Sequence, residues 1–198
     1  MTLTISLILI TAAISLAALS IDRRIFEKGL LRPYRTVREQ TWYEVITSGF
    51  LHASLTHLFV NMFVLFFFGI VMERTLGGGY YMALYFSALI VSSLPSLIRY
   101  REEPNYATVG ASGAVQAVLF SYIFVFPTET IIIVLLPIPI PAWIFGLAFL
   151  AYSVYEGKRR VGNVNHEAHI AGAIWGILYM ILFVPNSVDH ILTIFGLL

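Results

Sequence analysis

The residue best suited to chemistry in this sequence is a serine between small residues. The segment Gly110-Ala111-Ser112-Gly113 follows a polar loop and opens a long apolar run, so it places one hydroxyl at the edge of an apolar helix. Gly110 and Gly113 leave room for a substrate backbone or another helix beside Ser112. A serine hydroxyl is a weak nucleophile near neutral pH, so catalysis requires a base from elsewhere in the chain. His169 is the candidate base.

A histidine and an asparagine form the next candidate pair. His57 and Asn61 are four residues apart, so they share one face of a helix, and both offer hydrogen-bond donors. Such donors stabilise negative charge that develops on a carbonyl oxygen, at roughly 3 to 4 kcal/mol per donor where this has been measured. The pair is therefore a candidate oxyanion hole.

A small-residue stripe accompanies His169. Ala168, Gly172 and Gly176 repeat every four residues, which allows their helix to pack closely against a neighbour. Close packing of this kind is what would bring His169 within hydrogen-bond reach of Ser112. The stripe alone is weak evidence, because such spacing is common in membrane helices.

These groups belong to a chain far more apolar than a soluble domain. Of its 198 residues, 59% are hydrophobic and 12% charged, with a mean hydropathy of +0.84. This composition predicts an all-α, polytopic membrane protein in contact with the lipid bilayer. The net charge of +1 gives no reason to expect a nucleic-acid partner, and the absence of cysteine excludes disulfides and thiolate catalysis. No cofactor is indicated.

The apolar runs predict one domain, residues 1–198, built from six transmembrane helices. The predicted helices are 3–19, 53–72, 80–98, 111–126, 141–155 and 165–184. The first loop, 20–51, interleaves six Lys and Arg with aromatic residues, so we expect it to lie at headgroup level. The proline-rich segment 127–141 is expected to form an apolar loop at the interface, and 185–198 a short tail.

The first apolar run is expected to stay in the mature protein. No Lys or Arg precedes residues 3–19, unlike a cleaved secretory signal. Cleavage near residues 18–20 is the alternative.

An antiparallel arrangement places the starts of the second, fourth and sixth helices on one membrane face. The polar residues at those starts are His52, His57, Asn61, Ser112, His166 and His169. Ionisable side chains inside a bilayer cost a few kcal/mol each, so they need partners or a water-filled cavity and indicate a functional site. The structural alternative is that Ser112 bonds to a carbonyl one turn back while the histidines hold helices together.

Taken in order, the motifs resemble the rhomboid family of intramembrane serine proteases in its six-helix bacterial form. The matching segments are HASLTHLFVN (52–61), ER (73–74), GASG (110–113) and AHIAG (168–172). The resemblance implies a Ser112 and His169 dyad that cuts transmembrane proteins near the membrane surface. It also implies an oxyanion hole made by His57, Asn61 and the Ser112 backbone N–H, and a bacterial inner-membrane location.

The resemblance assigns supporting roles as well. His52 is expected to be structural within the first loop, and the other supporting residues are Gly110, Gly113, Gln116, Ala168 and Gly172. Two departures from the family pattern concern the anchoring of the first loop and the orientation of His169. Tyr43 and Glu44 stand where a Trp-Arg pair is frequent, so the anchoring of the first loop is expected to differ. Gln116 replaces a tyrosine that would stack on His169, so a hydrogen bond from Gln116 is the substitute to look for.

Other functions fit parts of the pattern. The segment His166-Glu-Ala-His169 superficially suggests a zinc protease, but its histidines are three apart and the HExxH spacing is absent, so no metal is predicted. Glu167 points to another side of its helix from His169, which favours a dyad over a triad. A proton-coupled transporter would need inverted repeats that are not evident. A catalytically inactive rhomboid-fold module that binds or moves membrane proteins is the main alternative.

Two arguments about orientation conflict. Six of the twelve Lys and Arg lie in the first loop, two in the third and three in the fifth, and only Arg74 lies on the opposite side. The positive-inside rule therefore places the candidate site on the cytoplasmic face. The family resemblance implies the reverse, with both termini in the cytoplasm, and this second orientation is the one we expect.

Overall fold

The computed structural model describes residues 2–133, 136–159 and 164–198. The main helices are α1 (Leu3–Ser20), α5 (Leu55–Val64), α6 (Ile70–Leu76), α7 (Gly78–Arg99), α8 (Ser112–Val125), α9 (Ala142–Arg159) and α10 (His166–Phe183). A π-helical segment, η2 (Leu65–Gly69), joins α5 to α6. The shorter elements are α2 (Arg23–Gly29), α3 (Pro33–Arg38), α4 (Glu44–Thr47), η1 (Ser48–Phe50), β1 (Thr130–Ile133), β2 (Leu136–Pro141) and α11 (Ser187–Ile194).

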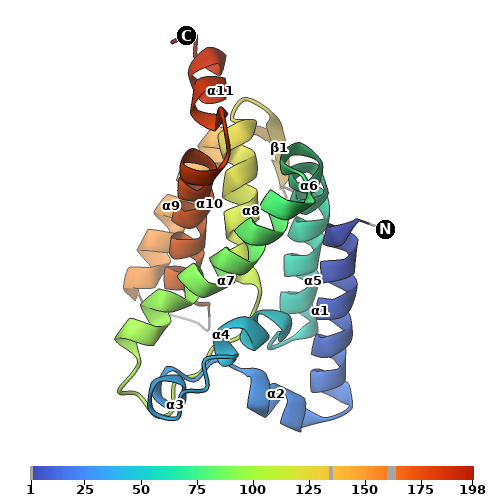
Figure 1. Cartoon of the computed structure of the whole chain (residues 1–198), viewed down its shortest axis with the longest axis vertical. Helices are drawn as coiled ribbons and strands as arrows, with labels where there is room; N and C mark the ends of the chain where they lie inside the picture. Colours follow the sequence, from blue (N-terminus) through green and yellow to red (C-terminus); the bar gives the residue numbers. More distant parts are fainter. Residues whose placement is uncertain (1, 134–135, 160–163) are drawn as a thin grey trace.

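The predicted bundle of membrane helices is confirmed. In the described part of the chain, four helical stretches are long and apolar enough to cross a bilayer, namely α1, Leu55–Leu76, α7 and α10. The shorter apolar helix α8 and the eighteen-residue α9 complete the predicted six. Figure 1 shows α8 in the middle of the bundle, with both chain ends far from α2 and α3. Elements of the first loop therefore cap one end of the molecule.

The central helix α8 is too short to cross a bilayer by itself. Its fourteen residues span about 21 Å at 1.5 Å per residue, against a hydrocarbon core of about 30 Å. Ten of these residues are buried, so α8 is enclosed by other helices. A buried helix that begins below the bilayer surface leaves polar groups at its start that need a water-accessible space. Ser112 is the first residue of this helix.

Close packing joins α8 to α10 along the stripe that the sequence indicates. A Cβ added to Gly172 would lie 2.0 Å from the Gly113 carbonyl oxygen, and one added to Gly176 would lie 2.2 Å from the Ala117 oxygen. The Ser121 hydroxyl also donates to the Gly176 carbonyl at 3.0 Å. We call this contact of Gly113, Ala117, Gly172 and Gly176 the α8–α10 seam.

The expected apolar loop at 127–141 is instead mostly a β-hairpin. Strands β1 and β2 are antiparallel, with Ile131 opposite Ile140 and Ile132 opposite Pro139. Alternate residues of a strand direct their N–H groups to the same edge, so prolines at 137, 139 and 141 remove donors from one edge only. Each strand of a two-stranded sheet has one unpaired edge. The prolines that prevent a helix here are therefore compatible with a strand.

Three further segments contain structure that the sequence did not specify. The first loop, 20–51, contains α2, α3, α4 and η1, and the tail, 185–198, contains α11. The second membrane helix continues past residue 72 to Leu76, with the π-helical segment in its middle. There Gly69 lies so close to α7 that an added Cβ would be 2.8 Å from the Tyr81 hydroxyl. A larger side chain could not pack at this position.

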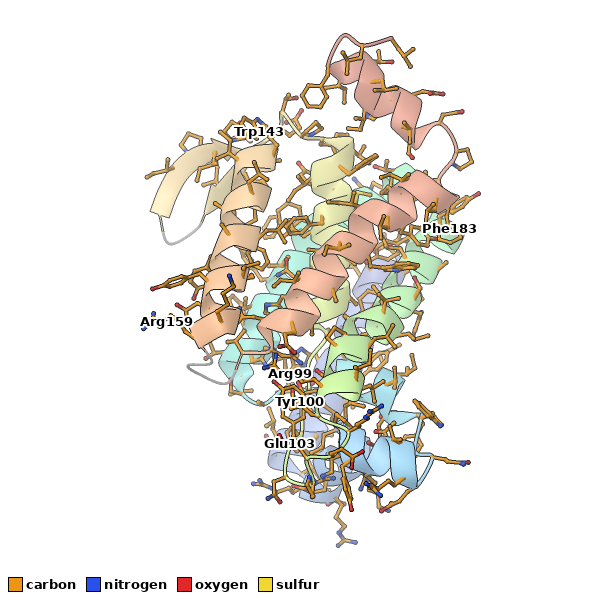
Figure 2. All side chains as sticks on the ribbon, turned by 90° about the vertical axis from the view of Figure 1, so that its left-hand side faces the viewer. Arg99, Tyr100, Glu103, Trp143, Arg159 and Phe183 are labelled. Atoms are coloured by element: carbon orange, nitrogen blue, oxygen red, sulfur yellow. The ribbon has the colours of Figure 1, made fainter. Side chains whose placement is uncertain are left out.

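Charged groups gather at the end of the molecule that carries the first loop. Figure 2 shows Arg99 and Tyr100 beside the start of α10, with Glu103 farther out, whereas Trp143 and Phe183 lie toward the other end. Arg99 forms an ion pair with Glu167 of α10, and it is the last residue of α7. This polar end surrounds the start of α8.

Candidate active site

One cavity contains most of the predicted site residues. It has a volume of about 620 Å³ and lies among the starts of α5, α8 and α10 and the loop before α8. The predicted residues in its walls are His57, Asn61, Gly110, Ser112, Gly113, Gln116, Ala168 and His169. His52 and Gly172 lie outside these walls. Predicted site residues up to 112 positions apart in sequence thus line one space that is large enough to hold water.

Ser112 lies at the N-terminus of α8, where backbone donors are free. The first N–H groups of a helix have no acceptor one turn back, so they are available to an anion or a polarised carbonyl. Gly110 adopts a positive φ of 125°, which turns the chain sharply into the helix. Its N–H donates to the Ser48 carbonyl at 3.0 Å, which fixes this turn against the first loop. The turn places Ser112 in the wall of the cavity.

His169 lies in the first turn of α10, across the cavity from α8. Its backbone N–H donates to the Asn165 carbonyl at 3.2 Å. Its ring centroid is 6.3 Å from that of Phe149 on α9 and 5.9 Å from that of His166. Within the described residues, no hydrogen bond joins the Ser112 hydroxyl to the His169 ring, although both line the cavity. Hydrogen bonds of catalytic pairs are often long without substrate and shorten when it binds.

His57 and Asn61 lie on the α5 wall of the cavity. A Cβ added to Gly110 would lie 2.7 Å from His57 Cε1, so the imidazole lies directly against the turn before Ser112. Asn61 is 5% exposed and donates one amide hydrogen to the His57 carbonyl at 2.9 Å. Its second amide hydrogen remains for a ligand in the cavity, because the side-chain amide carries two. These positions suit donors to a carbonyl oxygen held beside Ser112.

His52 connects α1 to the turn before Ser112. Ser15 of α1 donates its hydroxyl hydrogen to the Phe50 carbonyl at 2.8 Å, so its oxygen must accept from His52 Nδ1 at 3.0 Å. Nε2 of His52 is then unprotonated, and the Ala111 N–H points to it at 3.5 Å. Burial lowers the pKa of His52 to about 3, with a smaller contribution from His57. His52 is therefore a neutral structural group outside the cavity.

The two departures from the family pattern have different outcomes. Gln116 lines the cavity, and its Oε1 is buried without a hydrogen-bond partner in the described structure. Among the described residues, no hydrogen bond from Gln116 to His169 is present either. An aromatic ring near His169 comes instead from Phe149 of α9. The spacing from Ser112 gives no signal of this residue, which belongs to another helix.

Glu44 is the second departure, and it anchors the first loop. The carboxylate is fully buried and accepts from the Arg32 N–H at 3.0 Å, the Thr36 hydroxyl at 2.8 Å and Arg35 Nε at 2.7 Å. Burial by itself would raise the pKa of Glu44, but these hydrogen bonds outweigh it and lower the pKa below 4.5. Sequence reasoning identified an altered anchor at Tyr43 and Glu44 but not a buried carboxylate.

Asn165 is the functional candidate that sequence reasoning missed. Its side chain is the N-cap of α10 and also reaches α7 and the loop before α8. It lines the cavity of Ser112 and a second cavity of about 560 Å³ toward the charged end, which the Arg99 and Glu167 ion pair also lines. The sequence signal was the helix start itself, where asparagine is a favoured cap.

The metal alternative finds no ligand set in the described part of the chain. No group of three or more His, Asp or Glu side chains there could hold a metal ion. His166 and His169 approach each other edge to face with ring centroids 5.9 Å apart. These two imidazoles alone do not make a zinc site, which requires three or four ligands.

Comparison with known proteins identifies relatives across most of the chain. A family model described as a Rhomboid domain matches residues 39–186. The chain is 34% identical over 139 residues to "Rhomboid protein 1, mitochondrial" of Saccharomyces cerevisiae, which covers 68% of this chain and 40% of that protein. It is 31% identical over 148 residues to "Putative rhomboid protease YdcA" of Bacillus subtilis. This match covers 74% of this chain and 69% of that protein.

A third relative is "RHOMBOID-like protein 12, mitochondrial" of Arabidopsis thaliana. It is 27% identical over 146 residues, covering 66% of this chain and 43% of the relative. The chain thus spans less than half the length of the yeast and plant proteins. The helix α1 lies before the first residue of the family-model match.

Proposed function

The chain belongs to the rhomboid family, and we propose that it is an intramembrane serine endopeptidase that uses Ser112 as nucleophile and His169 as base. The observation that carries this proposal is that Ser112, His169, His57 and Asn61 line one cavity at the start of a short, enclosed helix. Membership of the family supports a membrane-embedded protease or a related module. The roles of the individual residues are proposed on the geometry of the cavity.

Acyl transfer at this site proceeds in two steps. The Ser112 oxygen attacks the carbonyl carbon of a peptide bond while His169 takes the hydroxyl proton. The oxyanion accepts hydrogen bonds from the Ser112 N–H, His57 and Asn61, and His169 then protonates the leaving amine. A water molecule attacks the acyl-enzyme, again with His169 as base, and releases the new carboxyl group. No carboxylate is assigned to orient His169, so the pair acts as a dyad.

The short central helix explains how a membrane protein supplies water to this reaction. Because α8 is shorter than the hydrocarbon core, the cavity beside Ser112 would bring a water-accessible space to the depth of a transmembrane substrate. A substrate helix keeps its carbonyls in intrahelical hydrogen bonds, so the cut segment must unwind locally before attack. Substrates with residues of low helix propensity near the cut are therefore expected to react faster.

Substitution of the nucleophile tests the proposal. Ser112→Ala is expected to lower cleavage of a transmembrane reporter by at least about 10³-fold and to abolish covalent labelling by a fluorophosphonate. Ser121→Ala is the matched control, since Ser121 lies on the same helix, bonds to Gly176 and is outside the cavity. It should still be labelled. Wild-type cleavage by the Ser112→Ala variant would overturn the assignment of the nucleophile, whereas an absence of cleavage and of labelling in the unsubstituted protein would favour an inactive module.

The membrane and the orientation remain predictions. We propose that the charged end with the site faces away from the cytoplasm, as the family resemblance implies, and that the protein resides in a bacterial inner membrane. Both chain ends lie opposite the first loop, so a reporter at the C-terminus should report the cytoplasmic side (Figure 1). A reporter that is active only outside the cytoplasm would support the positive-inside orientation instead.

A further inference from the structure

Asn165 lies at the start of α10, the helix that carries His169. It is the N-cap of α10, and its Oδ1 accepts from the Ala168 N–H at 3.1 Å. Its backbone carbonyl accepts from the His169 N–H at 3.2 Å. The backbone N–H groups of Ala168 and His169, in the first turn of α10, therefore both donate to Asn165. A shift of Asn165 would move the imidazole with it.

The other end of the same side chain contacts the segment that leads to Ser112. Asn165 Nδ2 lies 2.9 Å from Ser96 Oγ on α7, 3.4 Å from the Tyr106 hydroxyl and 3.4 Å from Thr108 Oγ1. With two amide hydrogens it serves at most two of these acceptors fully at once, and Ser96 is the nearest. Thr108 lies four residues before Ser112.

Thr108 is itself held to the first loop. Its N–H and carbonyl exchange two hydrogen bonds of 3.0 Å with the carbonyl and N–H of Leu31. Asn165 is thus in contact with a braced segment rather than with a free loop. The Asn165 side-chain amide therefore links α10, which carries His169, to the segment that leads to Ser112.

We propose that Asn165 is a positioning residue that sets the separation between the Ser112 hydroxyl and the His169 ring. This inference rests on the proposed function, because it assigns those two groups as nucleophile and base. Capping alone does not require asparagine, since Ser and Asp cap helices about as well. Only an amide combines the acceptor for Ala168 with donors for Ser96 and Thr108. Displacement of reacting groups by about 1 Å can cost on the order of 10²-fold in rate.

The variant Asn165→Ser separates the two roles, because serine retains a cap and lacks the amide donors. We expect the thermal midpoint in detergent to change by less than about 2 °C. We expect kcat for the transmembrane reporter to fall about tenfold to hundredfold while KM stays within about twofold. The rate of fluorophosphonate labelling should fall with kcat, because labelling also requires the base. A wild-type kcat, or a raised KM at unchanged kcat, would overturn the inference.

A double-mutant cycle tests the route through α7. Ser96→Ala is expected to lower kcat in the wild-type background and to have no further effect in Asn165→Ser, since the partner amide is then absent. Additive losses would contradict the route through Asn165. Thr2→Ala is the control for a lost cap, because Thr2 caps α1 through the Ile5 N–H far from the cavity and its loss should leave kcat unchanged.

The result is distinguishable from failure of the proposed function. If Ser112→Ala retains activity, the nucleophile is wrong and Asn165 has no dyad to position. If Ser112→Ala is inactive and Asn165→Ser has wild-type kcat, the dyad stands and only the positioning inference fails.

Discussion

Two contacts that brace the candidate site are built in opposite ways. The α8–α10 seam places backbone against backbone, with no side chain between Gly172 and the Gly113 carbonyl or between Gly176 and the Ala117 carbonyl. The first-loop cluster of Arg32, Arg35, Thr36 and Glu44 instead surrounds one buried carboxylate with hydrogen bonds. The seam depends on the missing side chains of its glycines, whereas the first-loop cluster depends on the negative charge of Glu44.

The two contacts act on the same short stretch of chain. The seam begins at Gly113, directly after Ser112. The first-loop cluster holds Arg32, whose neighbour Leu31 is paired with Thr108 just before the turn at Gly110. Ser112 is therefore fixed from one side by van der Waals contact and from the other by polar contacts. The seam should therefore resist acid but tolerate no added carbon, whereas the polar contacts should weaken in acid.

The largest expected effect comes from adding one methyl group to the seam. In Gly172→Ala, the new Cβ would lie 2.0 Å from the Gly113 carbonyl oxygen, and backbone cannot move aside as a flexible side chain can. We expect the free energy of unfolding in detergent to fall by about 3 kcal/mol or more, at the upper end for overpacking. Reporter cleavage should be lost with it, since the two helices must separate. Denaturant titration and the cleavage assay measure the two effects.

Gly146 of α9 offers the matched control. A Cβ there would meet the Ile123 side chain at 3.2 Å, and this methyl-bearing neighbour can adjust its rotamer. Gly146→Ala is expected to change the free energy of unfolding by less than about 1 kcal/mol, since the helix propensity of alanine offsets the crowding. Equal losses in the two variants would show that the seam is not specially tight.

The second-largest expected effect is a loss of stability in acid through His52, which contacts the turn before Ser112. Since burial lowers the pKa of His52 from 6.5 to about 3, the folded protein binds fewer protons at this group than the unfolded chain. Its contribution to stability is complete above pH 6.5 and is lost progressively as the pH falls toward 3. We expect the free energy of unfolding to fall by about 2 kcal/mol between pH 7 and pH 5 from this group.

A variant without the imidazole checks that assignment. His52→Gln removes this titrating imidazole, so its free energy of unfolding should be lower at pH 7 and should fall less steeply toward pH 5 than that of the wild type. Denaturant titrations of both proteins across this pH range measure the slopes. An equal slope in the variant would mean that another group causes the acid sensitivity.

The sequence predicted those features of the fold that depend on local pattern. Apolar runs marked the membrane helices, and the four-residue spacing of Gly172 and Gly176 indicated a close contact before any partner was known. Once six crossings were assigned, the starts of α5, α8 and α10 had to lie at one end. That argument alone placed His57, Ser112 and His169 together.

The features that were missed depend on contacts between distant segments. The proline-rich segment 127–141 excludes a helix, but the pairing of β1 with β2 is a choice among extended forms that composition does not decide. Asn165 was recognisable only as a helix start, because its acceptors on α7 and in the loop lie 57 to 69 positions earlier. Glu44 was recognised only as a departure from the family pattern. Its burial depends on contacts with Arg32, Arg35 and Thr36, which the sequence does not indicate.

The smallest effect concerns the charge at the centre of the first-loop cluster. Glu44→Gln keeps the size of the side chain but removes the charge that Arg35 and the Arg32 N–H bind. Hydrogen bonds to a charged group contribute about 1.5 to 3 kcal/mol each, and the amide retains part of them, so we expect a loss of about 1 to 2 kcal/mol at pH 7. Because hydrogen bonding lowers the pKa of Glu44 below 4.5, its stabilisation is present above pH 4.5 and is lost as the pH falls further. The difference between variant and wild type should therefore shrink below pH 4.5, as denaturant titration would show.

Glu102→Gln is the control, since its pair with Arg38 is exposed and should contribute less than about 0.5 kcal/mol. If both substitutions cost the same, the buried charge does not brace the loop, and the seam alone would have to hold Ser112 in place.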